Sequence, residues 1–248
     1  MNTIYILWLR QLKRYFRSKS RIIGSLGQPL LFLVALGFGF GPVFAKAGSG
    51  NYLEFLAPGV ISMGIIFTAL FSGIEIIWDR QFGFLKETLV APTSRLEIMI
   101  GRTLGGATVA SLQGIIILIL SFFVGFRLYN LMNLPFALLF IFLIALLFTA
   151  LGTAIASVLQ DMQGFQLIMN FLVMPLFFLS GALFPLDDLP LFLEKITKAD
   201  PLTYGVDGLR GILTNNSHFG LGTDFLILSM ITVVILLIGS YLFSRIEI

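Results

Sequence analysis

The chain has 248 residues, of which 57% are hydrophobic and only 12% are charged. Soluble domains carry about 25% charged and about 45–50% apolar residues, so this composition argues against a soluble core in a charged shell and predicts an integral membrane protein. The net charge of +3 is small, and the lack of cysteine excludes disulfides, cysteine-bound zinc and thiol catalysis.

Residues 1–21 predict an amphipathic helix in the membrane interface. Five apolar or aromatic side chains share one side, namely Tyr5, Trp8, Leu12, Tyr15 and Phe16, and five basic side chains share the other, namely Arg10, Lys13, Arg14, Arg17 and Arg21. A basic helix with aromatic anchors lies flat at the cytoplasmic leaflet, so membrane lipid is an expected partner. Basic stretches also bind nucleic acid, but apolar anchors beside a span argue against that partner.

Six apolar stretches are long enough to cross the roughly 30 Å hydrocarbon core, which takes about 20 residues. They cover residues 22–44, 57–78, 104–126, 134–159, 165–183 and 225–243. Backbone polar groups in lipid must be satisfied, and these stretches lack the alternation of barrel strands, so each is expected to be a helix.

Basic residues in the connecting segments predict the orientation. Eleven lie before the first span, between spans two and three, and after the sixth span, whereas five lie on the other side. The cytoplasmic side carries the excess of Lys and Arg. We therefore expect a multi-pass protein of the plasma (inner) membrane with both termini in the cytoplasm.

Glu75 is the one acid well inside a predicted span. Ionisable groups at membrane depth usually face a cavity or a partner, which makes Glu75 a possible gating acid or half of an interhelical pair. Because it lies one turn from Asp79 and Arg80, it can also simply reach the cytoplasmic interface. The sequence leaves these alternatives open.

The cytoplasmic loop 79–102 predicts a short helix. Apolar residues recur at i, i+3 and i+7, namely Phe82, Leu85 and Leu89, and Gly83 and Pro92 mark the start and the end of the helix. A short helix with an exposed apolar stripe is suited to docking in a groove of another protein. The alternative is a helix packed against the spans of this chain.

The third span begins with two local signals. Ser94 and Glu97 have the spacing of a capping box. Gly101 and Gly105 form a pair of small residues four apart, which lets two helices approach closely. The surrounding glycines lack the Lys-Ser/Thr of a phosphate-binding loop, so the sequence predicts that ATP binds to another chain.

The fifth span is rich in Phe and Met. Such side chains make adaptable apolar surfaces, so four of them are candidates for lining a path for amphipathic molecules: Phe171, Met174, Phe177 and Phe178. The alternative for each is contact with lipid or packing between helices.

Residues 184–213 predict two short helices that are too short to span. Pro190 fits the first turn of one, with Asp187 or Asp188 near its start, and Asp200-Pro201 reads as an N-cap followed by Pro. After Asp200, four apolar residues share a stripe, namely Leu202, Val206, Leu209 and Leu213, while Asp207 and Arg210 are spaced to pair on the opposite face. Re-entrant or interfacial helices fit this pattern, and an ordered external loop is the alternative.

Two motifs on opposite faces resemble those of ABC-2 type permeases, the membrane subunits of ATP-driven exporters. The first is "GFLKE" followed by "LVAPTSR" in the cytoplasmic loop, and the second comprises Ser180-Gly181, Phe184-Pro185, Leu189-Pro190, the run from Pro201 to Tyr204, and Asp207 with Arg210. The sequence is most similar to the branch of drug-export and nodulation-factor permeases. Asp200 departs from the pattern, because relatives often have Asn there.

The resemblance implies an all-α transmembrane domain over 1–248. Its parts are an interfacial helix over 1–21, spans one to five over 22–183 with the coupling loop 79–102, an external segment of two re-entrant helices over 184–223, and span six with a cytoplasmic tail over 224–248. It also implies a homodimer that binds two ATP-binding-cassette nucleotide-binding subunits. ATP and Mg would lie on those subunits, and this chain would bind no cofactor or metal.

The resemblance further assigns roles to residues. Contact with the ATPase subunit would involve Phe82, Gly83, Phe84, Leu85, Lys86, Glu87, Leu89 and Pro92. The external gate between protomers would involve Pro190, Pro201, Tyr204, Asp207 and Arg210.

The expected function is export of an amphipathic or hydrophobic compound, drug-like or lipid-like, by a chain with no catalytic site of its own. Export of a lipid-linked glycan is the alternative. A secondary transporter would place several ionisable residues at mid-membrane, and only Glu75 comes near that position.

Overall fold

The computed structural model describes residues 3–46, 51–90, 92–186 and 189–246, and in this part of the chain every regular element is helical. The elements are α1 (Thr3–Arg17), α2 (Lys19–Lys46), α3 (Tyr52–Phe71), α4 (Ile74–Gln81), α5 (Phe84–Val90), α6 (Arg95–Val124), η1 (Leu131–Asn133), α7 (Leu134–Val158), α8 (Met162–Leu179), α9 (Leu191–Ala199), α10 (Pro201–Thr214) and α11 (Leu221–Ser244). Asp187 and Asp188, expected near a helix start, lie outside the described residues.

The six predicted spans are confirmed. Six helical stretches of the described chain are long and apolar enough to cross a membrane, and α3 with α4 forms one of them. The third span starts nine residues earlier than predicted, at Arg95, because the Ser94–Glu97 capping box forms. The second starts at Tyr52, where the Asn51 side chain accepts a hydrogen bond from the Leu53 amide. The chain is therefore an all-α integral membrane protein.

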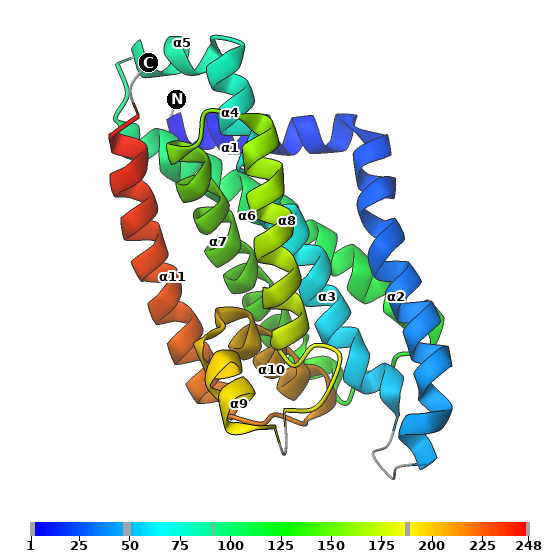
Figure 1. Ribbon diagram of the computed structural model, residues 1–248. Helices are drawn as coiled ribbons and strands as arrows, with labels where there is room; N and C mark the ends of the chain where they lie inside the picture. The colour runs from blue at the N-terminus through cyan, green and yellow to red at the C-terminus, as the bar shows by residue number, and fades with distance from the viewer. Residues whose placement is uncertain (1–2, 47–50, 91, 187–188, 247–248) are drawn as a thin grey trace.

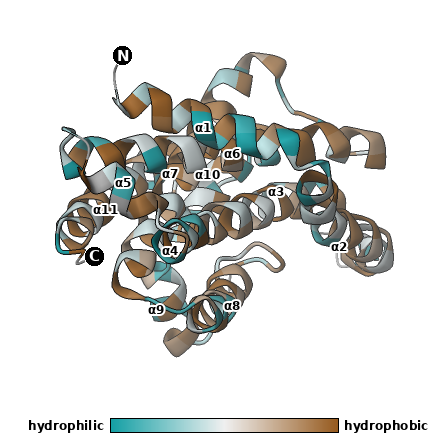
Figure 2. Ribbon diagram, turned by 90° about the horizontal axis from the view of Figure 1, so that it is seen from above, coloured by the Kyte–Doolittle hydropathy of each residue, from teal (hydrophilic) through white to brown (hydrophobic). Residues whose placement is uncertain are grey.

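The helices form a bundle around α3, α6 and α7, which contact one another extensively (Figure 1). α11 packs on α7, whereas α2 stands at the opposite edge. α1 lies across one end of the bundle, beside α6, and both termini and α5 lie at this same end (Figures 1 and 2). We call it the α1 end. α9 and α10 occupy the opposite end, which we call the α10 end.

α11 is fastened to the start of α6 at the α1 end. Arg95 Nη1 donates hydrogen bonds to the carbonyl oxygens of Ser244 and Ile246, at 2.6 and 2.9 Å respectively. The last carbonyls of a helix have no partner inside the helix, so a basic side chain stabilises this end.

The sequence predicts an apolar and a polar face for α10, but in the structure every residue from Leu202 to Leu213 is buried. α3, α7 and α11 surround it, which places it inside the bundle rather than on the surface. The predicted ion pair between Asp207 and Arg210 does not form. The Asp207 carboxylate accepts the amides of His218 and Phe219 instead, because the loop after α10 folds back over it.

Candidate functional site

The densest group of charged side chains lies at the α1 end, where α1, α2 and α6 converge on α4. Its acids are Glu75 and Asp79, one helical turn apart on α4, and its cations are Arg10 and Arg14 of α1, Arg21 of α2 and Arg102 of α6. We call these six residues the charge cluster. Both acids are buried, so each carboxylate requires a partner.

Asp79 joins α1 to α6. Each of its carboxylate oxygens accepts a 3.0 Å hydrogen bond from Arg10, in the bidentate geometry that makes arginine–carboxylate pairs strong. Its Oδ2 also accepts a 2.6 Å hydrogen bond from Arg102. Arg102 is 3% exposed, and its Nε and Nη1 have no hydrogen-bond partner among the described residues. The buried Arg102 charge therefore depends on Asp79.

Glu75 joins α2 to α1. Arg21 donates a 3.0 Å hydrogen bond to its carboxylate, and Arg14 lies 3.5 Å from the second oxygen without a hydrogen bond. Of the alternatives for Glu75, the interhelical pair forms, and the residue is only 3% exposed. A gating role remains a prediction.

The contact of α1 with α6 corrects the prediction that α1 rests mainly on lipid through its aromatic side. Leu7, Gln11 and Tyr15 are its buried residues, whereas Tyr5 and Phe16 are exposed. The Tyr15 hydroxyl donates to Gln113 of α6 at 2.8 Å, and the Trp8 indole donates to Thr108 at 3.0 Å. Polar groups of α6 thus select the inward face of α1.

Gly101 and Gly105 permit this contact. A Cβ at Gly101 would lie 3.0 Å from the Ile4 carbonyl oxygen, and one at Gly105 would lie 2.6 Å from Gln11 Cγ. The predicted close approach of two helices at this glycine pair is therefore confirmed, and the helix that approaches is α1. The approach turns the basic face of α1 toward α4.

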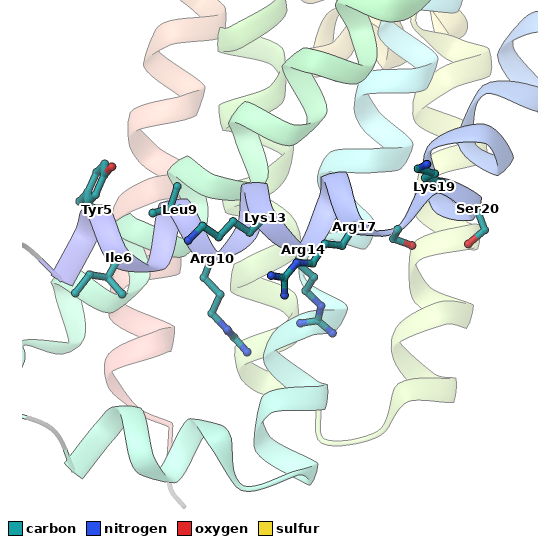
Figure 3. Close-up of a pocket in the computed structure, with 10 residues that line it drawn as sticks. Tyr5, Ile6, Leu9, Arg10, Lys13, Arg14, Arg17, Lys19 and Ser20 are labelled. Carbon is teal, nitrogen blue, oxygen red and sulfur yellow. The ribbon is translucent and has the colours of Figure 1, made fainter.

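α5 connects to the charge cluster through Arg10. The Arg10 guanidinium lies 3.9 Å from the ring centroid of Phe84, the first residue of α5, while it also binds Asp79. Figure 3 shows Arg10 and Arg14 extending from α1 on the side of α5, along an open groove of about 920 Å³. Arg10 thus contacts both α4 and α5.

The predicted docking stripe on α5 is only partly available. Phe82 is 80% exposed, but Leu85 is completely buried in this chain's own core, so it cannot contact another protein. α5 folds back along α4, which turns Leu85 inward. Gly83 has φ +82° at the helix start, Glu87 and Pro92 are exposed, and the side chains of Lys86 and Leu89 lie outside the described residues.

The four path candidates on α8 do not share one surface. Phe171 is 80% exposed, and Met174 and Phe178 are about half exposed, but Phe177 is completely buried. The Phe177 ring packs on Phe32 of α2 with its centroid 6.0 Å away. The cause is the 3.6-residue helical period, which turns neighbouring positions to different faces.

At the α10 end, polar side chains join α9 to α10. Pro190 precedes α9, Pro201 is the first residue of α10, and the Asp200 side chain accepts the Leu202 amide at 2.8 Å as the predicted N-cap. Burial raises the pKa of Asp200 to about 7. The Tyr204 hydroxyl donates to the Lys198 carbonyl at 2.8 Å.

Sequence reasoning missed Asp224, in the first turn of α11. Its side chain is completely buried beside the Asp207 carboxylate. It also missed the pairing of Asp79 with Arg102. The available signal was a pair of acids, Glu75 and Asp79, four residues apart on one helix. Several arginines of the same predicted cytoplasmic side were available as partners.

Comparisons with known proteins agree with this architecture. The family model described as ABC-2 type transporter matches residues 2–214. A putative transport permease, ycf38, of Cyanophora paradoxa is 30% identical over 221 residues, which are 86% of this chain and 75% of the relative. Nodulation protein J of Rhizobium leguminosarum bv. trifolii is 29% identical over 211 residues, which are 84% of this chain and 78% of the relative. The ycf38 permease of Porphyra purpurea is 33% identical over 207 residues, with shares of 81% and 70%.

Proposed function

Because the chain belongs to the ABC-2 type transporter family, we propose that it exports an amphipathic or hydrophobic compound as the permease subunit of an ATP-driven exporter. Permeases of this family associate with a separate ATP-binding subunit and lack an ATPase domain of their own. The sequence agrees with this division, since it has no Lys-Ser/Thr phosphate-binding loop.

The observation that carries the proposal is the double contact of Arg10. The ATP-binding subunit docks at α5 and the residues just before it, where Phe82 is 80% exposed and Val90, at the end of α5, is 83% exposed. Movement of α5 shifts Phe84, and the Arg10 guanidinium on that ring passes the shift to Asp79 and α4. Because α4 continues α3, the second span receives the displacement.

The charge cluster then distributes the displacement. Arg102 connects Asp79 to α6, and Arg21 connects Glu75 to the start of α2. Ion pairs between rigid helices can exchange partners without unfolding either helix, which makes them suitable for a two-state element. In this role Glu75 is a gating acid.

Two copies of the chain and two ATP-binding subunits form the exporter. Support comes from α2, α8 and α11, whose apolar windows are only 17%, 22% and 17% buried within one chain. They face a second copy or lipid, and the exposed Phe171, Met174 and Phe178 of α8 line the path of the cargo between the copies. The cargo is amphipathic because these surfaces are apolar and adaptable.

The α1 end faces the cytoplasm, and the α10 end faces outward. The excess of basic residues around α1, α5 and the C-terminus supports this orientation. α9 and α10 then close the outer end of the path, with Tyr204, Asp207 and Arg210 holding the closed arrangement through their bonds to backbone groups.

Co-purification with the cognate ATP-binding subunit tests the proposal. Phe82→Asp places a charge on the exposed docking surface and should reduce recovery of that subunit about tenfold, which corresponds to the loss of one good contact. Phe192→Asp is the matched control, because Phe192 of α9 is equally exposed, at 74%, but lies at the other end. Equal recovery with both variants, or ATP hydrolysis by this chain alone, would contradict the proposal.

A further inference from the structure

A polar pocket and an apolar groove meet at the α10 end. The polar pocket has a volume of about 490 Å³ and lies between the start of α3, the second half of α10 and the loop before α11. The apolar groove has about 590 Å³ and lies between α2, the start of α3 and the segment after α8. Phe44 and Pro185 line both, so the polar pocket and the apolar groove adjoin each other.

Arg210 gives the polar pocket a buried positive charge. It is 6% exposed, its Nε and Nη2 donate to the carbonyls of Phe55 and Gly181 at 3.3 and 2.8 Å, and its guanidinium lies 3.9 Å from the Phe55 ring centroid. No carboxylate of the described residues lies within ion-pair distance of it. Burial lowers the pKa of Arg210 to about 10, so the group is still a cation at neutral pH. The direct partners of Arg210 are neutral groups, and the Asp207 carboxylate acts on its charge only from beyond ion-pair distance, so the cation can still take an anionic ligand.

The acids of the pocket have different roles. The Asp207 carboxylate is occupied by the backbone amides of His218 and Phe219, at 2.8–2.9 Å. Glu54, half-buried in the first turn of α3, accepts a single long hydrogen bond of 3.3 Å from Asn51. The pocket therefore offers Arg210 for an anionic group and Glu54 for a cationic one.

The apolar groove provides for a hydrocarbon chain. Phe32, Leu36, Phe40 and Val43 of α2 line one side of it, and Tyr52 and Phe178 line the other. Phe40 and Val43 are 54% and 63% exposed in this chain. Burial of an acyl chain in such a groove is favourable because it removes apolar surface from water, so the groove selects for a chain but not for a headgroup.

We propose that this site binds one zwitterionic phospholipid, with its phosphate on Arg210, its ammonium group against Glu54 and an acyl chain in the apolar groove. A purely anionic lipid would meet the Glu54 carboxylate, and an uncharged lipid would leave Arg210 without an anion. The proposal concerns binding of the lipid to this chain alone, so the inference does not depend on the proposed export function.

Native mass spectrometry of the delipidated chain tests the proposal, with dioleoyl-phosphatidylethanolamine, dioleoyl-phosphatidylglycerol and dioleoylglycerol as probes with identical acyl chains. We expect phosphatidylethanolamine to bind about tenfold more tightly than either of the others, which corresponds to one charged contact. Equal affinities for the three lipids would overturn the proposal, and so would exclusion of all three by a second copy of the chain.

Substitutions separate the two headgroup contacts. Arg210→Gln should weaken binding of phosphatidylethanolamine about tenfold. Glu54→Gln, on the less buried side chain, should remove the preference for phosphatidylethanolamine over phosphatidylglycerol. Lys198→Gln, on exposed α9 outside the pocket, is the control and should change neither affinity. If Arg210→Gln does not fold, Glu54→Gln decides alone: an unchanged preference would overturn the proposal. The chain is measured without an ATP-binding subunit, so failure here is distinct from failure of the export function.

Discussion

The two ends of the bundle treat buried charge in opposite ways. At the α1 end, arginines and carboxylates from four helices bind one another, whereas at the α10 end Asp207 and Arg210 bind backbone groups although they are three residues apart on one helix. Side chains that bind each other across helices can change partners, but backbone groups are fixed by the fold. The α1 end therefore holds its charges through contacts between side chains of different helices, and the α10 end holds them through contacts with backbone groups.

Removal of Asp79 should have the largest effect on stability. Asp79→Ala leaves the buried Arg102 without its only carboxylate, and loss of one partner of a buried pair costs about 3–5 kcal/mol. Urea unfolding in detergent measures the loss. Arg10→Ala should cost clearly less, because Arg10 is about one-third exposed and Arg102 keeps its pair. Equal losses of unfolding free energy in Asp79→Ala and Arg10→Ala would show that the charge cluster does not depend on Asp79.

Asp200 should give the α10 end a pH-dependent stability. Its folded-state pKa of about 7 lies above the ordinary value of 3.8, so the folded protein holds the proton more tightly than the unfolded chain. The contribution of Asp200 to the free energy of unfolding should be complete below about pH 4 and should be lost as the pH rises from about 4 to about 7, by up to about 4 kcal/mol.

Asp200→Asn should abolish this dependence, because an amide retains the cap without a charge. Thermal unfolding of both proteins at pH 5 and pH 8 provides the measurement, and the variant should be the more stable one at pH 8. A wild-type protein that is equally stable at both pH values would contradict the expectation.

Gly105→Ala should separate α1 from α6 with a smaller effect. The added Cβ would lie 2.6 Å from Gln11 Cγ, and overpacking of this kind costs about 1–3 kcal/mol. The matched control is Gly222→Ala in α11, where no atom lies within 4 Å of the new Cβ. Chemical unfolding should show destabilisation by the first and not by the second. Equal behaviour would mean that α1 is not held closely against α6.

Glu194→Gln should have the smallest effect. The Glu194–Lys198 pair on α9 is short, at 2.6 Å, but both side chains are about half exposed. Exposed pairs of this kind contribute little, because water and salt screen them. The melting temperature should stay unchanged, and a clear decrease would show that α9 contributes to the rigid α10 end through its surface.

The sequence was sufficient for the features that depend on local order. Span lengths, the Ser94–Glu97 capping box, the Asp200 N-cap and the Gly101–Gly105 contact all arise from residues close together in the chain. Each has a physical cause that acts within one or two helical turns, so a single sequence contains the necessary information.

The features that depend on neighbours could not be predicted. Arg10 and Asp79 are 69 residues apart, and no local sequence pattern indicates that they form a pair. Periodicity identified an apolar stripe that includes Leu85. It could not show whether this stripe packs against this chain or against another protein. Spacing permitted a pair between Asp207 and Arg210, but it could not show that backbone groups would occupy both first.

The Arg95 contact gives α5 a second support. The start of α5 contacts Arg10, which also binds α4. After α5 the chain continues to α6, whose first residue, Arg95, binds the carbonyls at the end of α11. In the proposed exporter, a displacement of α5 would therefore reach the second span through Arg10 and the sixth span through Arg95. The sixth span, far from α5 in sequence, would then move together with the coupling segment.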